Sequence, residues 1–144
     1  MPVRPVPEGF HTVTPYLVVP DPARLIEFVK AAFGAEEIDR TADPSGRVMH
    51  ATVRVGNSMV MMGQSTEKHP PQPSMLYLYV PDCDATYRAA VKAGGRSIME
   101  PVDQWYGDRS GAVFDPFENQ WWIGTHKEDF SPEELATRRA AVKR

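Results

Sequence analysis

The side chains best suited to chemistry in this sequence include four histidines, because imidazole can bind a metal ion or exchange a proton near neutral pH. His11 lies just before the first expected strand, and His69 lies in a proline-rich stretch where we expect solvent around it. His50 and His126 lie in strand-like segments instead. Two imidazoles without a neighbouring carboxylate make an incomplete metal site. We therefore interpret them as hydrogen-bonding groups of a polar cavity or its rim, and we keep metal ligation as the alternative.

Aromatic side chains form the second group of candidate functional residues. Tyrosine and tryptophan can stack on a flat organic molecule while their polar atoms orient it. In this chain they are concentrated in strand-like segments, together with threonine and histidine. This combination predicts a site for an aromatic or planar small-molecule ligand. The residues expected to line that site are Thr14, Tyr16, His50, Tyr77, Tyr79, Trp105, Trp122 and His126.

The expected strands have two different faces, because successive side chains of a strand point to opposite sides. In the segment 75–80, Leu76, Leu78 and Val80 alternate with Met75, Tyr77 and Tyr79. The other expected strands alternate in the same way between aliphatic residues and aromatic or polar ones. We expect helices to cover the aliphatic face and the opposite face to form a concave cup. The alternative is that the aromatic face covers a solvent-side surface or contacts another subunit.

The order of these elements is repeated within the chain. Val19-Pro20-Asp21 recurs as Val80-Pro81-Asp82, about 60 residues later and in the same context of a strand followed by a helix. Each repeat predicts the order βαβββ. The expected fold is α+β, with two such modules forming a cup-shaped mixed β-sheet, helices outside, and a C-terminal helix. Within one domain of residues 1–144 we place module 1 at about 10–63, a linker at 64–74, module 2 at about 75–127 and the last helix at about 131–142.

Local signals mark where these elements begin and end. The first strand is expected from Thr12 to Val19. Asp21 is expected to cap the following helix, with a proline at its first position, and Gly34 is expected to end it. Ser131 and Glu134 have the spacing of a capping box, which predicts the start of the C-terminal helix. Asp108-Arg109 is interpreted as a local ion pair that orders a turn, with contact between Arg109 and an anionic ligand as the alternative.

Composition limits the possible partners. The chain has 144 residues, 42% of them hydrophobic, and a formal net charge of −3 without a block of basic residues, which argues against nucleic acid and anionic membranes as partners. It contains no apolar run long enough to span a membrane and no signal-like N-terminus. A single cysteine excludes an internal disulfide. These features predict a cytoplasmic protein.

Several stretches resemble a known family. They are 14–19, 50–56, 76–80, and a longer one from Trp105 to Trp121 that includes Trp-Tyr-Gly-Asp-Arg and Asp-Pro-Phe-Glu-Asn. Together they resemble the vicinal oxygen chelate superfamily of glyoxalase I, bleomycin-resistance proteins and extradiol dioxygenases, and within it the PhnB-like branch, over about residues 10–130. The family usually has glycine where Glu118 stands, so we expect a less tight turn there.

The resemblance implies a divalent metal held by histidine and glutamate, but the corresponding positions hold other residues. They fall at Thr14, Met75 and Trp122, and the end of the fourth strand near Met62 offers no carboxylate. These side chains are poor ligands for such metals. We therefore expect a metal-free and cofactor-free small-molecule-binding protein or an enzyme of unknown substrate, forming a homodimer as the family commonly does. The alternative is a divalent-metal-dependent lyase, isomerase or dioxygenase that uses His50, His126 and a carboxylate not located by the sequence.

Overall fold

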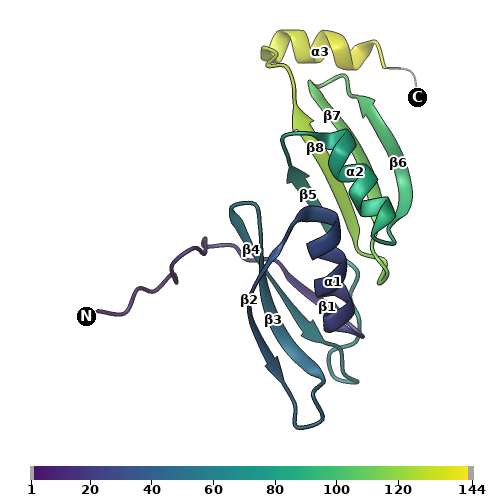
Figure 1. Ribbon diagram of the computed structural model, residues 1–144. Helices are drawn as coiled ribbons and strands as arrows, with labels where there is room; N and C mark the ends of the chain where they lie inside the picture. The colour runs from purple at the N-terminus through teal and green to yellow at the C-terminus, as the bar shows by residue number, and fades with distance from the viewer. Residues whose placement is uncertain (1, 143–144) are drawn as a thin grey trace.

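The computed structural model describes residues 2–142, and its elements follow the predicted order (Figure 1). Each repeat contributes a strand, a helix and three further strands, and one helix follows the second repeat. The elements are β1 (Tyr16–Val19), α1 (Pro22–Phe33), β2 (Glu36–Ala42), β3 (Val48–Val55), β4 (Ser58–Gln64), β5 (Met75–Tyr79), α2 (Cys83–Lys92), β6 (Arg96–Asp103), β7 (Asp108–Phe114), β8 (Gln120–His126) and α3 (Pro132–Ala140).

The strands form two four-stranded mixed sheets, in the orders β1-β4-β3-β2 and β5-β8-β7-β6. In each sheet the first strand pairs in parallel with the last strand, and the other pairs are antiparallel. The predicted α+β fold with two βαβββ modules is confirmed. From here, module 1 means β1 to β4 with α1, and module 2 means β5 to β8 with α2.

The strand register shows that the two modules are true structural repeats. Tyr16 pairs with Met61 as Tyr77 pairs with Trp122. Two residues further along, Gly63 is the partner of Val18 and Gly124 is the partner of Tyr79. Positions of β1, β3 and β4 therefore have counterparts in β5, β7 and β8, which allows a direct comparison of their side chains.

The helices α1 and α2 lie side by side and cover the aliphatic face of the sheets (Figure 1). Both modules share one buried cluster, which includes Leu17 of β1 and Ile123 of β8. The ring of Phe33 at the end of α1 lies 4.9 Å from the ring of the fully buried Trp121 on β8. Burial of such large apolar side chains across the module boundary ties the two repeats together.

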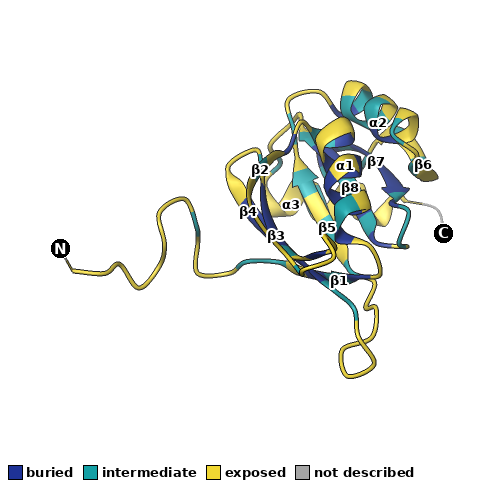
Figure 2. Cartoon of the chain, turned by 60° about the horizontal axis from the view of Figure 1, so that its bottom comes forward, coloured by how far each residue is buried: buried dark blue, intermediate teal, exposed yellow. Residues whose placement is uncertain are grey.

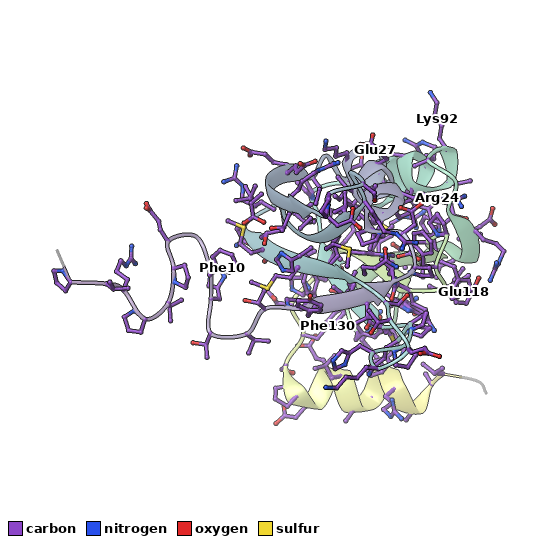
Figure 3. All side chains as sticks on the ribbon, turned by 90° about the horizontal axis from the view of Figure 1, so that it is seen from below. Phe10, Arg24, Glu27, Lys92, Glu118 and Phe130 are labelled. Carbon is purple, nitrogen blue, oxygen red and sulfur yellow. The ribbon has the colours of Figure 1, made fainter. Side chains whose placement is uncertain are left out.

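The third helix lies on the opposite side of the sheets. Figure 3 shows α3 on one side and the labelled Arg24, Glu27 and Lys92 of α1 and α2 on the other. The capping box of α3 is formed, with Ser131 and Glu134 exchanging side-chain-to-backbone hydrogen bonds as predicted. None of its nine residues, all of which the structure describes, is buried. No helix in the described residues 2–142 is long and apolar enough to span a membrane.

The ends of the first strand and helix follow from local chemistry. The Asp21 side chain caps α1 by accepting a hydrogen bond from the Arg24 amide, and Gly34 ends the helix in the left-handed conformation, as predicted. β1 begins at Tyr16 and not at Thr12. Pro15 has no N–H with which to continue a ladder, and residues before it form no strand. This N-terminal segment extends away from the modules (Figures 1 and 2).

The turn before β8 corrects the expectation for Glu118. This residue adopts a φ of 69°, the left-handed conformation that glycine favours, so the turn is as tight as with glycine. The side chain of Asp115 stabilises it by accepting hydrogen bonds from the backbone amides of Phe117 and Asn119, at 2.7 and 3.1 Å. The Glu118 carboxylate pairs with Arg96. These contacts offset the cost of the backbone conformation.

Candidate functional site

The predicted alternation of faces is confirmed by burial. Leu17 and Val19 of β1 are buried, whereas the intervening Val18 is partly exposed and Tyr16 is exposed (Figure 2). On β8, Trp121 and Ile123 are buried on the helix side, and Trp122 is half-buried on the other. We call the side of both sheets that faces away from α1 and α2 the helix-free face, because α3, although it lies on that side, does not pack along any strand. The candidate site lies there.

Asp108 forms the centre of a hydrogen-bonded cluster on the helix-free face of module 2. Its side chain is only 4% exposed. The Oδ2 atom accepts hydrogen bonds from the hydroxyls of Tyr77 and Tyr79, both at 2.9 Å. The Oδ1 atom lies 2.9 Å from Nδ1 of His126, whose Nε2 lies 2.6 Å from Asp129 Oδ1. We call these five residues the Asp108 cluster. It brings together three of the residues predicted to bind a ligand.

Two elements position the members of the Asp108 cluster. Strand pairing places Asp108 directly opposite His126. The chain after β8 then turns back, because the amides of Lys127 and Glu128 both bond to the carbonyl of Gly107. Gly107 has a φ of 103°, and a side chain there would collide with the backbone of Glu128. This close approach, which only glycine permits, carries Asp129 to the outer nitrogen of the histidine.

The hydrogen bonds of the cluster change the protonation of its members. Hydrogen bonding to Asp129 and then to Asp108 raises the pKa of His126 above its ordinary value. Burial works against ionisation of Asp108, yet the bonds from His126, Tyr77 and Tyr79 hold the pKa of this carboxyl below its usual range. Burial and the neighbouring carboxylate raise the pKa of Tyr77. Bonding to Asp108 raises the pKa of Tyr79. The cluster therefore combines two carboxyl groups, two phenols and an imidazole whose protonated form the carboxyl groups favour.

The fold itself does not require this cluster, as module 1 shows. Continuing the strand register places Val48 where module 2 has Asp108, and Ser65 where it has His126. Val18 stands where module 2 has Tyr79. The same βαβββ unit therefore folds with apolar and small side chains at these positions. A buried carboxylate is costly unless it is paired, so its presence in one module only points to a role in function.

One feature of the site is common to both modules. A tyrosine of the first strand lies across a glycine of the last strand, Tyr16 over Gly63 and Tyr77 over Gly124. In each case a Cβ atom on the glycine would overlap the tyrosine hydroxyl and ring. Because glycine has no side chain, the tyrosine ring can lie directly against the backbone of the last strand.

In module 1 the helix-free face contains a hollow of about 280 Å³, lined by Tyr16, Val18, Gly63, Gln64 and His69. His50 lies beside it, with its ring 5.7 Å from that of Tyr16. The amide nitrogen of Gln64 donates to the carbonyls of Pro20 and Ser65, at 2.8 and 3.2 Å. Its Oε1 atom is buried and, among the contacts of the described residues, has no hydrogen-bond partner.

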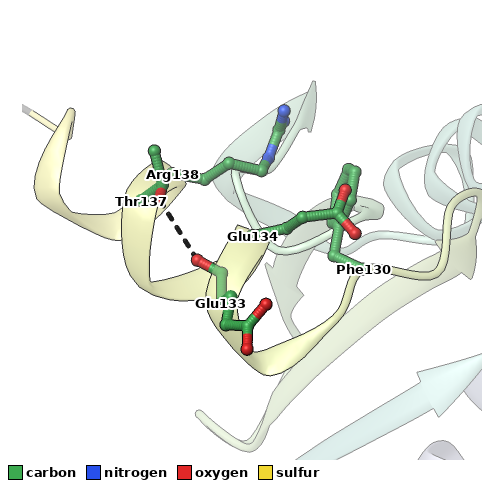
Figure 4. Close-up of a pocket in the computed structure, with 5 residues that line it drawn as sticks. All are labelled: Phe130, Glu133, Glu134, Thr137 and Arg138. Carbon is green, nitrogen blue, oxygen red and sulfur yellow. Dashed lines mark hydrogen bonds between the residues drawn. The ribbon is translucent and has the colours of Figure 1, made fainter.

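A second hollow, of about 330 Å³, lies along α3 (Figure 4). It is lined by Phe130, Glu133, Glu134, Thr137 and Arg138. Near this helix the structure places Trp105, which was predicted to contact a ligand. Its carbonyl accepts a hydrogen bond from Arg138 Nε at 2.6 Å, and Arg139 lies 5.5 Å from its ring.

The remaining predicted residues are not members of the Asp108 cluster, although Trp122 is the strand partner of Tyr77. Thr14 is partly exposed in the segment before β1. Trp122 is on β8, and its Nε1 donates to the Gln120 side chain at 3.0 Å. His50 is in module 1, whereas His126 is in module 2, so each histidine belongs to a different sheet.

The interpretation of Asp108-Arg109 as a local ion pair is wrong. Arg109 pairs with Asp84 of α2, at 2.7 and 3.0 Å, and with Asp103. Asp108 faces the other side of the sheet. Adjacent residues of a strand point in opposite directions, so these two side chains could not meet. The sequence reasoning also missed Asp129 and the buried amide of Gln64.

The donor set does not fit the divalent metal that the resemblance implied. Thr14, Met75 and Trp122 offer no imidazole or carboxylate. Both nitrogens of His126 are within hydrogen-bond distance of carboxylates, so neither presents a free lone pair when the ring is protonated. Among residues 2–142 we find no group of three or more His, Cys, Asp or Glu arranged to hold a metal ion.

Comparison with known proteins gives a consistent result. A family model described as the Glyoxalase/Bleomycin resistance protein/Dioxygenase superfamily matches residues 9–123. An uncharacterized protein of Mycobacterium bovis is 32% identical over 134 residues, covering 85% of this chain and 88% of its own. An uncharacterized protein of Mycobacterium tuberculosis strain H37Rv is also 32% identical over 134 residues, and the match covers 85% of this chain and 79% of that protein.

Solved structures share the fold. TioX from Micromonospora sp. ML1 superimposes with a TM-score of 0.71 at 21% identity, covering 81% of this chain and 98% of its own. TnmS3, an antibiotic binding protein from Streptomyces sp. CB03234, gives a TM-score of 0.66 at 18% identity, covering 81% of this chain and 96% of its own.

Proposed function

The chain belongs to the glyoxalase/bleomycin resistance protein/dioxygenase superfamily, and we propose that it binds an aromatic or planar small molecule on its helix-free face without a metal. It acts as a binding protein or as an enzyme whose substrate is not yet identified. The proposal includes the PhnB-like branch, a cytoplasmic location and a single domain over residues 1–144.

The Asp108 cluster is the observation that carries this proposal. Tyr77 and Tyr79 lie with their ring centroids 5.1 Å apart, and they are 39% and 67% exposed. Two large rings on a sheet surface would normally be free to change rotamer. Here the shared carboxylate holds both hydroxyls, so the rings are ordered before a ligand arrives. Such preorganisation reduces the entropy lost on binding.

The other predicted residues extend this surface. Tyr16, the counterpart of Tyr77, and His50 form an aromatic pair in module 1, and Trp122 on β8 is the strand partner of Tyr77. Trp105 and Thr14 are proposed to contribute at the edges of the site. The proposed ligand-binding residues are therefore Thr14, Tyr16, His50, Tyr77, Tyr79, Trp105, Trp122 and His126.

A relative of the same fold supports binding as the activity. TnmS3 is described as an antibiotic binding protein. A protein of this kind protects a cell by sequestering a drug and needs no chemical step. We propose that this chain works in the same way for its own ligand.

We further propose a homodimer. Val13 is 81% exposed, Met75 is 63% exposed and Tyr79 is 67% exposed. Large exposed apolar groups on one side of a molecule are typical of a surface that contacts another subunit or a ligand. Light scattering of the purified protein tests this, since a monomeric mass at micromolar concentration would contradict it.

The test of binding is a panel of planar aromatic compounds and antibiotics, monitored by melting temperature and tryptophan fluorescence. At least one class should raise the melting temperature of the wild-type chain. The double variant Tyr77→Ala/Tyr79→Ala should abolish that shift. The matched control is Tyr87→Ala, because Tyr87 lies on α2 and bonds to Ser97 instead. An unresponsive wild-type protein would refute the proposal.

Elemental analysis of protein purified without a histidine tag tests independence from metal. We expect less than a stoichiometric amount of zinc, nickel, manganese or iron. One equivalent per chain would favour the metal-dependent lyase, isomerase or dioxygenase instead.

A further inference from the structure

We infer that the ligand is a planar cation that donates hydrogen bonds, and that the Asp108 cluster selects it against anions of the same shape. This inference rests on the proposed function, because it specifies the chemistry of the molecule bound at that site. It follows from where the protons of the cluster lie, from its charge, and from an acceptor in module 1 that has no donor.

The hydroxyl protons of the two tyrosines have a fixed direction. A carboxylate can only accept hydrogen bonds, so at 2.9 Å both Tyr77 and Tyr79 must donate to Asp108 Oδ2. Their single protons are thereby used. What remains on each phenol oxygen is lone-pair density, together with the electron-rich face of the ring. Tyr77 and Tyr79 therefore offer a ligand acceptors and π faces but no donors, although the hydroxyl of Tyr106 lies close to Tyr77.

The charge of the cluster favours the same ligand. Asp108 and Asp129 contribute two negative charges and the imidazolium of His126 contributes one positive charge. A net negative charge remains even with the histidine protonated. Arg109, the nearest arginine in the sequence, lies on the other face and is paired with Asp84 and Asp103. A cation over the tyrosine rings gains both from this charge and from the ring quadrupole.

Gln64 in module 1 is a further acceptor on the helix-free face, in the hollow of the other sheet. Its amide nitrogen is bonded to two backbone carbonyls, Pro20 and Ser65. Rotating the amide by half a turn would set its oxygen against those carbonyls, so its orientation is fixed. The buried Oε1 atom at the hollow beside Tyr16 lacks a donor within the described residues. An unpaired buried acceptor is destabilising, and an N–H or O–H group of a ligand in that hollow would satisfy it.

The experiment uses two ligands with one ring system and opposite charge, 9-aminoacridine and acridine-9-carboxylate. Calorimetric titration of the full chain at neutral pH and low salt should show about tenfold tighter binding of the aminoacridine. The preference should decrease as salt is added, because salt screens charges at exposed sites.

Two variants that change the net charge equally distinguish an effect of the Asp108 cluster from an effect of the charge of the whole chain. Asp108→Asn introduces a side-chain N–H that can donate to a tyrosine oxygen, which turns a hydroxyl proton outward. This variant should lose the preference. Asp39→Asn on β2 of module 1, an exposed position, should retain it. Circular dichroism checks that both variants are folded.

The outcomes distinguish the two proposals. If the wild-type chain binds both acridines equally, or the carboxylate more tightly, the face binds planar molecules but the inference is wrong. If Asp39→Asn loses the preference as fully as Asp108→Asn, the selection is general and the cluster does not cause it. If neither acridine binds and the wider panel also fails, the proposed function is refuted and the inference with it.

Discussion

Replacing Asp108 with valine tests whether the cluster is a functional addition to a fold that does not need it. Valine is the side chain that module 1 has at this position, so the backbone accommodates it. The change removes the acceptor of the two tyrosine bonds and of the bond from His126. Hydrogen bonds to charged groups contribute about 1.5–3 kcal/mol, and the lower value applies to Tyr77 and Tyr79 because both rings are partly exposed.

The gross loss from the two tyrosine bonds is therefore about 3 kcal/mol. The bond from the half-exposed His126, which keeps Asp129 as a partner, adds a smaller loss, because ion pairs at exposed sites contribute little. Burying the valine side chain, in place of a carboxylate that had to be desolvated, returns roughly 1.5 kcal/mol. We expect the free energy of unfolding to fall by about 2 kcal/mol. Urea denaturation monitored by circular dichroism measures it, and the slope m should be unchanged because the fold is retained.

Tyrosine ionisation gives a second readout that a change in overall stability would not move. In the wild-type chain Tyr77 and Tyr79 titrate above the ordinary value of 10.0. In Asp108→Val both pKa values should move back toward it, which ultraviolet absorbance detects. The control is Asp39→Val, at an exposed position of β2, for which we expect a change within about 0.5 kcal/mol.

Two results would contradict the reasoning about Asp108. An unchanged unfolding midpoint together with unchanged tyrosine titration would mean that the carboxylate does not hold the rings. A loss of more than about 4 kcal/mol, a size reserved for severe core defects, would mean that module 2 depends on Asp108 to fold. In that case the comparison with Val48 of module 1 would be misleading.

Two further predictions concern other parts of the site. The raised pKa of His126 means that its contribution to stability is complete below the ordinary value of 6.5 and is lost as the pH rises through the folded-state value. NMR titration should give a pKa above 6.5 for His126, and this pKa should fall in Asp129→Asn. A value at or below 6.5 in the wild-type chain would be inconsistent with the cluster. Gly124→Ala should displace the Tyr77 ring from Gly124 and destabilise the protein by about 1–3 kcal/mol. The ligand response in the melting assay should also be lost. Retained binding would show that contact between Tyr77 and Gly124 is not needed for the site.

Most of the fold could be predicted from the sequence because its signals are local. Alternation along each strand identifies the buried face, and the caps at Asp21 and Ser131 mark where helices begin. The start of β1 was placed too early because the alternation continues through Thr12 and Thr14 into a segment that Pro15 separates from the strand. Alternation of residue types predicts which way side chains point, but it does not predict the backbone hydrogen bonds that define a strand.

The candidate site was predicted only in part. Tyr77, Tyr79 and His126 were recognised from their types and their common face. Asp108 was assigned to its sequence neighbour Arg109, although the same alternation already sends the two to opposite sides of the sheet. Consistent use of that rule would have placed the carboxylate among the aromatic residues. Asp129 could not be found in this way, because its position depends on a loop that folds back onto Gly107.

The internal repeat separates what the fold needs from what function added. Positions alike in both modules, such as a tyrosine lying on a glycine, are consequences of the shared βαβββ unit or of a shared surface role. Positions that differ cannot be required by that unit. Asp108 and His126 differ from Val48 and Ser65, and they introduce a buried charge and an ion pair where apolar or small groups suffice. A net gain of about 2 kcal/mol over valine, estimated above, is small for a charge that must be desolvated and paired in this way. We therefore attribute the asymmetry between the modules to the proposed ligand, which would contact the two halves of the helix-free face differently.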